Sequence, residues 1–375
     1  MNICEVQTID RLQDYRSVWQ SLLLETPCAN FFQTFDWREA YWRHFGVEQQ
    51  LRVLIVTEGD AVTGILPLVL RTEQTKVGSL RFATYPMDHW GSFYGPIGAN
   101  PDAVLAAGLD YLCSQQSDWD VLEPRWIGAE SGECERVEAL LSAAGNSPIR
   151  SELDATAIID LQGSWDDYLA SRDGKWRNNT RRWERQLSKL GEINHKRHRP
   201  DADYEVDAGW EYYEECSRIA ARSWQASSTT GTTLTHESVS AFLRDVHLAA
   251  AKCGCLDMNL LQVDGRAIAF TYNYAFNGNV FSLRSGFDPY CPVKGAGSLL
   301  YVKTIEDSFR RGDWQYDLGP RHLKCKRKLL THVLPVYRVS CFKRWSLRQQ
   351  LIRIKRNLEA APLALNQGEA AASST

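Results

Sequence analysis

Long apolar runs are missing from this sequence of 375 residues. The best candidate for a membrane span, LRVLIVTEGDAVTGILPLVLR, is interrupted by Glu58, Asp60 and Pro67, so no segment is expected to cross a bilayer. The first residues, MNICEVQTIDRLQDYRSVW, lack the basic start and apolar centre of a secretory signal. We therefore expect a cytoplasmic protein.

A large excess of charge and paired cysteines are also absent. The net charge of -3 argues against a protein that coats nucleic acid, so DNA is not an expected partner and any cationic site has to be local. The ten cysteines include no CxxC pair, which is typical of reduced thiols. Cys253 and Cys255 have no second Cys or His pair near them, so no metal is expected. The segment NHKRHRP, with His195 and His198, is interpreted as a solvated basic loop.

The common catalytic signatures are missing as well. The sequence has no GxSxG, HExxH, Walker or GxGxxG pattern. Serine-hydrolase, zinc-peptidase and dinucleotide-binding chemistry are therefore not indicated, and a site has to be assembled from less specific features.

The length favours two domains, and a repeated pattern supports a duplicated mixed α/β fold. An apolar strand, an acidic-Gly turn and a second apolar strand occur in LIVTEGDAVTGILPLVL and again in LLQVDGRAIAFTYNY. A helical segment precedes each hairpin, and in the second half Thr235 is the expected N-cap. Chance similarity between two common hairpins is the alternative. We expect domains over residues 1–160 and 161–345, followed by a basic helix and a disordered tail over 346–375, a helix that offers weak peripheral membrane contact.

A strongly basic helix is expected soon after the domain boundary. Ser164 is a candidate N-cap, and the segment GKWRNNTRRWERQL then places Trp176, Thr180 and Leu187 on one apolar face. The opposite face is cationic. This face is either solvated or binds an anionic substrate, and the candidate binding residues are Lys175, Arg177 and Arg181.

The segment NVFSLRSGFDPYCPVKGAGSLLYVKTIEDSFRRGDWQYDLGP predicts a strand, a glycine-rich turn, a helix ending at Gly312 and a second strand. A glycine-rich turn before a helix leaves backbone N–H groups that bind phosphates, although ordinary turn chemistry also explains it. The candidate pyrophosphate-binding residues are Lys294, Gly295, Ala296, Gly297 and Ser298.

Six pieces in this order resemble the Gcn5-related N-acetyltransferases (GNAT). More narrowly, they resemble the two-domain acyltransferases related to Fem peptidyltransferases and the CelD-type proteins of cellulose-biosynthesis loci. The pieces are FFQTFDWREAYWRHFG, YPMDHWGSFYGPIG, SRDGKWRNNTRRWERQL, VDGRAIAFTYNY, SGFDPYCPVKGAGSLL and YDLGPRHLKCKRKL.

The resemblance implies two tandem GNAT-like domains, each with a mixed central sheet flanked by helices. It implies an N-acyltransferase that moves an acetyl or aminoacyl group from acyl-CoA or an acylated RNA to an amine, in polysaccharide or cell-envelope precursor biosynthesis. Cleft residues carried over are Asp88, Tyr272 and Arg284, and Lys326 holds the lysine position after the strand. Asp88 is otherwise a turn residue and Tyr272 an alternating strand aromatic. The alternative is a catalytically silent binding protein for an anionic glycan or lipid-linked precursor.

Acyl transfer to an amine needs a base, because an amine with a pKa near 10.4 is mostly charged at neutral pH. Asp317 and His322 are the candidates, with Lys326 holding an anionic group or the oxyanion. Two alternatives stay open: Asp317 forms a structural ion pair with Lys324 or Lys326, and His322 is a surface residue. The proton donor to the leaving group is Tyr301, Tyr337 or Cys325.

Overall fold

The computed structural model describes residues 1–87, 90–114, 118–200, 207–227, 231, 233–342, 350–351 and 354. These residues divide into two compact units. The first comprises Met1–Phe35, Phe45–Ala155 and Leu334–Thr375, and the second comprises Asp36–His44 and Thr156–Val333. Most of the predicted C-terminal basic helix lies outside the described residues.

The first unit is built on a mixed sheet with the strand order β1-β2-β3-β4-β5-β13. Neighbouring strands are antiparallel except for β4 and β5, which are parallel. The strands are β1 (Asn2–Val6), β2 (Gln49–Glu58), β3 (Ala61–Thr75), β4 (Gly78–Thr84), β5 (Val121–Glu123) and β13 (His332–Phe342), with the short β6 (Ile127–Gly128) also pairing with β13.

Helices cover the sheet of the first unit. Helix α4 packs on β1, β2 and β3, where Gly108 lets it approach so closely that an added Cβ would lie 2.5 Å from Leu66. The helical elements are α1 (Ile9–Gln13), α2 (Arg16–Glu25), η1 (Phe31–Gln33), α4 (Pro101–Ser114), η2 (Ala129–Ser131) and α5 (Glu133–Ala143).

The second unit repeats this plan with the strand order β8-β9-β10-β11-β12-β7. Again the fourth and fifth strands, β11 and β12, are parallel, and the other neighbours are antiparallel. The strands are β7 (Ile149–Asp160), β8 (Ile193–His198), β9 (Leu256–Val263), β10 (Arg266–Phe276), β11 (Asn279–Phe287) and β12 (Gln315–Pro320).

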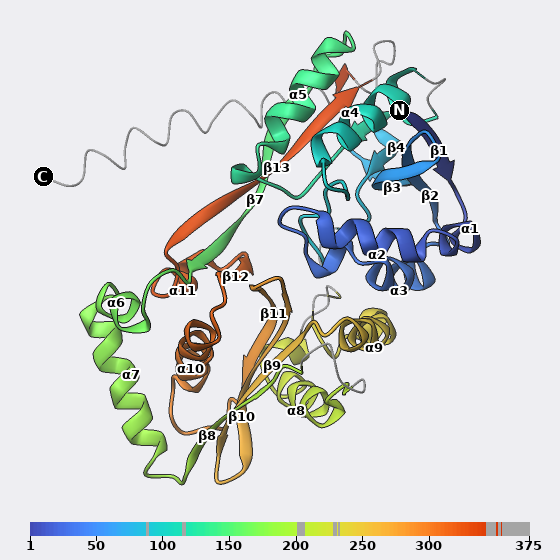
Figure 1. Cartoon of the computed structure of the whole chain (residues 1–375). Coiled ribbons are helices and arrows are strands. Elements are labelled where there is room, and N and C mark those ends of the chain that lie inside the picture. The colour runs from blue at the N-terminus through green and yellow to red at the C-terminus, as the bar shows by residue number, and fades with distance from the viewer. Residues whose placement is uncertain are drawn as a thin grey trace, which may run out of the picture. The chain divides into compact units, whose positions relative to one another are not determined.

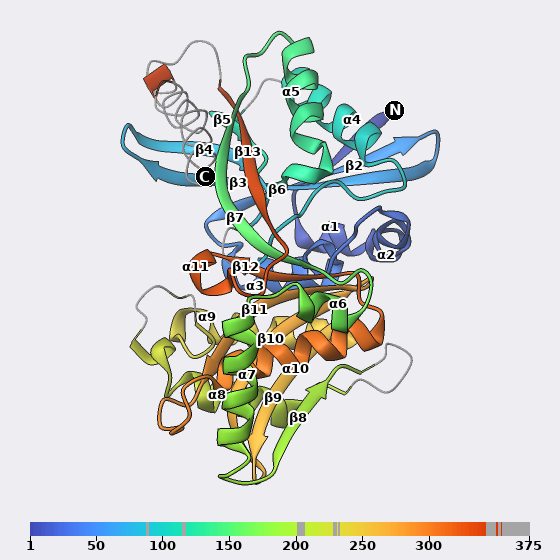
Figure 2. The same ribbon diagram turned by 90° about the vertical axis from the view of Figure 1, so that its left-hand side faces the viewer.

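In the second unit the helices lie on both faces of the sheet. Figure 1 shows α10 on one side of β9 to β11, with α8 and α9 on the other. Helix α7 runs beside α10 (Figure 2), and Glu184 of α7 pairs with Lys303 of α10 at 2.6 Å. The elements are α3 (Phe35–Phe45), α6 (Trp165–Ala170), α7 (Gly174–Leu187), α8 (Trp210–Ala220), η3 (Trp224–Ser227), α9 (Glu237–Lys252), α10 (Ala296–Arg311) and α11 (Leu323–Lys326).

The final strand of each sheet comes from the other half of the sequence. Strand β7 follows α5 of the first unit, yet its end pairs with β12 in the second. Strand β13 follows β12, and its end pairs with β5 in the first unit, Leu122 opposite Cys341. Both strands therefore run through both units.

Several predicted features are confirmed. The fold class is α/β with a mixed sheet flanked by helices. Ser164 caps α6 by accepting a hydrogen bond from the Asp167 backbone N–H at 3.1 Å. Gly312 ends α10 in the left-handed region with φ 73°, where glycine is unstrained. The hairpin between β9 and β10 turns at Asp264 and Gly265, both with positive φ.

Two local predictions are wrong. The segment NHKRHRP is largely strand β8. His195 is half-buried there, and its Nε2 lies 3.0 Å from Asn259 Oδ1. The N-cap of α9 is His236 rather than Thr235, since the His236 ring accepts a hydrogen bond from the Ser238 backbone N–H. Among the described residues, no helix combines the length and apolarity needed to cross a membrane.

Candidate functional site

Asp317 lies at the point where the pairing of β11 and β12 ends. The parallel register between these strands runs from Asn279 and Gln315 to Phe281 and Asp317. The Asp317 side chain is 5% exposed, and its Oδ1 accepts hydrogen bonds from Thr156 Oγ1 on β7 and from the Gly319 N–H at 2.7 Å. Within the described part of the chain, Asp317 forms no ion pair and its Oδ2 has no hydrogen-bond partner.

Burial raises the pKa of Asp317 above its ordinary value, and this rise is opposed by the hydrogen bond from Thr156, the hydrogen bond from Gly319 and the charge of Lys326. A carboxylate with a raised pKa is a stronger base than an exposed one. Asp317 is therefore suited to take a proton from a substrate amine.

The turn after Asp317 is held by Lys326. The Lys326 Nζ donates to the carbonyl oxygens of Gly319 at 2.7 Å and Pro320 at 3.0 Å. Arg321 and His322 follow with φ values of 63° and 52°, a left-handed conformation that is uncommon for non-glycine residues. Both side chains are exposed. The turn thus carries one anchored lysine beside Asp317 and two exposed basic residues.

A β-bulge brings Arg284 to the same face of the sheet as Asp317. Tyr274 pairs with Phe281, and Phe281 pairs with Asp317, so their side chains share a face. The register then shifts, so that Tyr272 pairs with Arg284, which would otherwise point to the opposite face. Burial and the nearby Arg321 lower the pKa of Arg284 to about 10. This face therefore holds both a buried carboxylate and a desolvated guanidinium.

Tyr272 lies on this face but deep in the core. It is 1% exposed, its hydroxyl lies 2.9 Å from His247 Nδ1 on α9, and its ring meets Tyr213 of α8 edge to face. It is thus a buried aromatic of an alternating strand. Its contacts show that the face of Asp317 is the one covered by α8 and α9.

Tyr301 lies on the opposite side of β11. Its hydroxyl is 3.5 Å from Ser282 Oγ, one residue beyond Phe281 and so directed to the α10 side. Of the three proposed proton donors, Tyr301 and the exposed Cys325 belong to the second unit, whereas Tyr337 belongs to the first.

The predicted phosphate-binding turn has an aromatic neighbour. Gly295 is the N-cap of α10 with φ 128°, and a Cβ added there would lie 2.4 Å from the indole of Trp183 on α7. Gly297 lies beside Phe287, at 3.5 Å from an added Cβ. Lys294 is exposed and Ala296 is buried, with Ser298 between these extremes. The N-terminal end of α10 is therefore flanked by two aromatic side chains.

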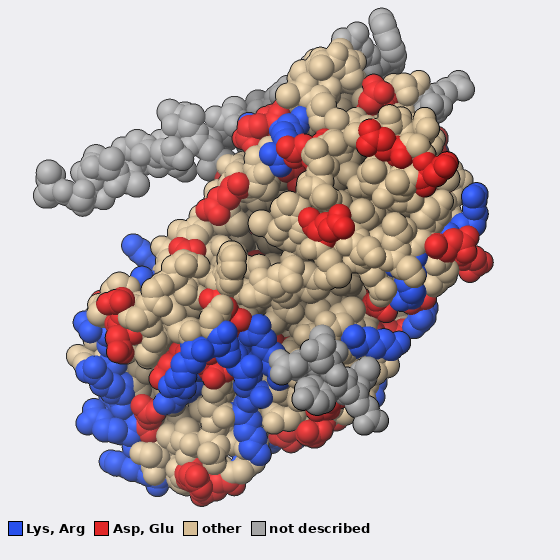
Figure 3. All heavy atoms as spheres, in the orientation of Figure 1, with Lys and Arg blue, Asp and Glu red and all other residues tan. Residues whose placement is uncertain are grey.

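The basic residues of α7 lie on the α10 side of the sheet. Trp176 and Leu187 pack with residues of α10, leaving Lys175 and Arg181 exposed and Arg177 half-buried. Figure 3 shows Lys and Arg side chains gathered over this part of the second unit. The structure therefore places them on the opposite side of the sheet from Asp317. Asp88 lies outside the described residues.

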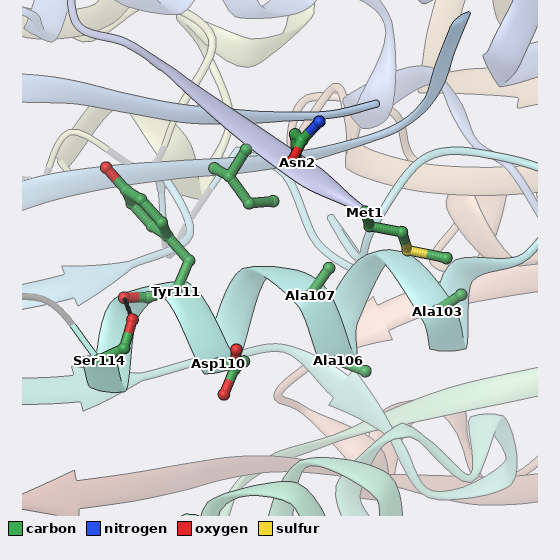
Figure 4. A pocket seen from close by; sticks show the side chains of 9 residues that line it. Met1, Asn2, Ala103, Ala106, Ala107, Asp110, Tyr111 and Ser114 are labelled. Carbon is green, nitrogen blue, oxygen red and sulfur yellow. Dashed lines mark hydrogen bonds between the residues drawn. The ribbon is translucent and has the colours of Figure 1, made fainter. Parts of the chain in front are cut away.

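A cavity of about 620 Å³ in the first unit is a poor alternative site. It lies between β1 and α4, and the side chains of Ala103, Ala106 and Ala107 face it (Figure 4). Asp110 is its carboxylate, and it is exposed. Among the described residues, no group of three or more His, Cys, Asp and Glu side chains is placed to hold a metal ion.

Sequence reasoning missed Thr156 and Trp183 as neighbours of the site. Thr156 reaches Asp317 across 161 positions of sequence, and no local pattern announces such a pair. Only the packing of α7 on α10 places Trp183 against Gly295.

The family model for the acetyltransferase (GNAT) domain matches residues 174–327. Those residues contain β8 to β12, the α10 turn and Asp317. Residues 174–327 are a GNAT domain. The topology of the first unit repeats that of the GNAT domain strand for strand, in agreement with the predicted tandem arrangement.

Solved structures share the fold of the whole chain. A structure of FemX has a TM-score of 0.56 with 11% identity, covering 95% of this chain and 100% of its own. L-PGS from Bacillus licheniformis has a TM-score of 0.51 with 13% identity, covering 88% and 98%. The C-terminal domain of a putative lysylphosphatidylglycerol synthetase from Agrobacterium fabrum has a TM-score of 0.53 with 12% identity, covering 92% and 96%. The resemblance to Fem-related proteins is thus confirmed at the level of the fold. No curated protein sequence matches the chain.

Proposed function

We propose that the protein is an N-acyltransferase that uses Asp317 as general base. The observation that carries the proposal is the buried Asp317 at the end of the β11–β12 pairing, with a raised pKa and with an Oδ2 that has no hydrogen-bond partner among the described residues. The GNAT match of the surrounding residues supports acyl transfer as the reaction.

In the proposed reaction the acceptor amine loses a proton to Asp317 Oδ2 as its nitrogen attacks the acyl carbonyl carbon. A carbon–nitrogen bond forms and the bond from the acyl carbon to the donor's sulfur or oxygen breaks. Lys326 adds positive charge beside the developing oxyanion. The leaving group takes a proton from Cys325 or, where it departs on the α10 side of the sheet, from Tyr301. His322, whose side chain is exposed, is not the base in this scheme.

The donor is an acylated carrier, either acyl-CoA or an acylated RNA. An acyl-CoA would place its pyrophosphate at residues 294–298, against the indole of Trp183. An acylated RNA would instead use the exposed cations of α7, Lys175 and Arg181 among them. We favour the RNA, because the Trp183 indole packs against Gly295 in the turn that would have to bind the pyrophosphate.

The acceptor is an amine of an anionic polysaccharide or cell-envelope precursor. Arg284 supports this choice, because a desolvated guanidinium on the Asp317 face suits a carboxylate or phosphate of the acceptor. FemX and the synthetases of similar fold do not by themselves assign a substrate to this chain, and the relation to CelD-type proteins stays a prediction. A cytoplasmic location and weak membrane contact through the C-terminal basic segment belong to the same proposal.

The experiment is acyl transfer measured by mass spectrometry. The protein is incubated with a panel of acyl-CoAs and aminoacylated RNAs and with amine-bearing precursors, and products are compared for the native chain, Asp317→Asn and Asp166→Asn. Asp166 is an exposed carboxylate in the same unit, so its variant is the matched control. A product lost in Asp317→Asn and kept in Asp166→Asn supports the proposal. No product with any donor, combined with tight binding of an anionic precursor, would favour the silent binding protein.

A further inference from the structure

A second cationic feature of the second unit has no role in the proposed reaction. A cavity of about 410 Å³ opens between the α6–α7 turn and the segment that follows α11. Its lining combines Arg172, Lys324, Arg327 and Lys328 with one carboxylate, Asp173, and the remaining lining residues are Ser171, Leu330 and Thr331. Four cations thus face one anion.

The charges in this cavity are not neutralised by the protein. In the described ranges of the chain, Lys324, Arg327 and Lys328 form no ion pair. The single carboxylate, Asp173, also caps α7, because its Oδ1 accepts a hydrogen bond from the Trp176 N–H at 2.8 Å. Clustered unpaired cations repel one another and raise the local positive potential, so an anion that enters gains from all of them.

The wall of the cavity is fixed by the fold. Arg172 donates to the carbonyl oxygens of Leu329 and Leu330, and its guanidinium lies 4.8 Å from the centre of the Tyr168 ring. The Thr331 N–H donates to the Ile158 carbonyl at 2.7 Å. The cations are therefore carried by an ordered backbone, which lowers the ordering cost of binding.

We infer that this cavity binds a phosphate group of a small, soluble ligand. Lysine and arginine side chains around a concave site suit a dianion, and Leu330 as the single apolar lining residue offers no surface for a base or an acyl chain. The inferred site is separate from Asp317, which faces the opposite side of the sheet.

Occupancy of the cavity has a route to the candidate base. Lys324 lies on α11, and Lys326 on the same short helix holds the carbonyls of Gly319 and Pro320. The Gly319 N–H in turn donates to Asp317. A ligand that restrains Lys324 therefore restrains the turn that positions Asp317.

The test is binding of inorganic phosphate and pyrophosphate to the full chain, by calorimetry at constant ionic strength set with chloride. We expect saturable binding that weakens at least tenfold in Lys324→Gln/Lys328→Gln and is unchanged in Lys76→Gln/Lys252→Gln, which removes two exposed lysines elsewhere. Equal affinity in both double variants, or no binding to the native chain, overturns the inference.

Two further arms decide the source of the phosphate and the coupling. A nucleoside diphosphate is expected to compete with pyrophosphate, whereas binding seen with phosphatidylglycerol vesicles and not with free phosphates would overturn the choice of a soluble ligand. Hydrogen exchange over residues 317–328 is expected to slow on addition of pyrophosphate, and unchanged exchange despite binding would overturn the coupling. Both readouts are independent of acyl transfer, so the proposed reaction and this site can fail separately.

Discussion

The two units place a buried carboxylate at matching positions and give it opposite surroundings. Glu123 belongs to the last residue pair between β5 and its parallel neighbour β4. Asp317 belongs to the last residue pair between β12 and its parallel neighbour β11. Each accepts a hydrogen bond from a hydroxyl of the final strand, Ser340 for Glu123 and Thr156 for Asp317.

The difference lies in the cation. Arg125 donates to Glu123 at 2.7 Å and also binds Glu73 through two hydrogen bonds of 2.9 Å, whereas Asp317 has no ion pair in the described structure. Burial with a paired arginine makes a structural carboxylate, and burial without one makes a base. The same arrangement of strands thus supports both uses. The two carboxylates differ in that Glu123 has an arginine two residues along the chain, Arg125, and Asp317 does not.

The largest expected effect is on Asp317. Asp317→Asn keeps the shape of the side chain and removes the base, so turnover should fall by about 10²–10⁴-fold. The folded pKa lies above the unfolded value of about 3.9, so ionised Asp317 costs stability at neutral pH and the variant should melt at an equal or higher temperature. Turnover by mass spectrometry and calorimetric melting measure the two. A variant that loses both activity and stability would show that Asp317 is a structural carboxylate like Glu123.

Glu123→Gln should do the reverse. The substitution removes one of the buried carboxylates that pair with Arg125, so the free energy of unfolding should fall by about 3 kcal/mol. Turnover of the folded fraction should stay within about threefold, because Glu123 touches no proposed substrate. Denaturant unfolding and turnover well below the melting temperature check this. A large loss of turnover with unchanged stability would contradict the assignment of roles.

The helices that follow β4 and β11 begin differently, which Gly295→Ala tests. Asn100 caps α4 in the first unit by accepting from the Ala103 N–H, whereas Gly295 caps α10 with φ 128° against Trp183. The added methyl group should lower the free energy of unfolding by about 2 kcal/mol. Gly297→Ala is the control, because its Cβ would lie at an ordinary 3.5 Å from Phe287 and alanine favours the helix. Equal stability of both variants would show that the Trp183 side chain moves away from the added methyl group at little cost in free energy.

Thr156→Val tests the hydroxyl that donates to Asp317, the counterpart of the Ser340 hydroxyl that donates to Glu123. Loss of the hydrogen bond that favours the ionised form should raise the pKa of Asp317 further. Turnover should rise with pH through that pKa, so the rising limb should move to higher pH and turnover on that limb should fall. A pH–rate profile measures the shift. Ser340→Ala is the matched control in the first unit, and its profile should not move.

The last prediction concerns Glu133, the carboxyl group of the first unit whose pKa is raised. Burial raises the pKa of Glu133 to about 7, against the hydrogen bond from Tyr85 at 3.1 Å. Its stabilising contribution is therefore full below about pH 4.3 and is lost as the pH rises through 7. At pH 8 the free energy of unfolding of Glu133→Gln should exceed that of the native chain by up to about 3.7 kcal/mol, and this gain should be absent at pH 4. A gain independent of pH would contradict a raised pKa.

Much of the second unit was predictable because its signals are local. Ser164, Asp264 and Gly312 are caps and turns whose conformation depends on a few neighbouring residues, and the helix over Ala296–Arg311 follows from its apolar spacing. Asp317 was identified as a strand-end carboxylate on the same kind of signal.

The rest depended on contacts between distant residues. His195 became half-buried because β8 pairs with β9 and brings it to Asn259, although the surrounding sequence is basic and polar. The face on which Arg284 lies depends on a register shift between β10 and β11. The periodicity of the sequence predicts neither the pairing of β8 with β9 nor this register shift. A bulge changes which residues share a face without changing the residues themselves.

The exchange of final strands has a consequence for how the chain is made. The sheet of the first unit needs residues up to Phe342, so a ribosome must synthesise the whole second unit before that sheet can be complete. The second unit, by contrast, has its last strand ready in β7 before β8 emerges. A gene fragment ending near residue 160 would leave the first sheet without its edge partner. Expression of single halves should therefore give aggregation-prone products, and the natural order of completion is second unit first.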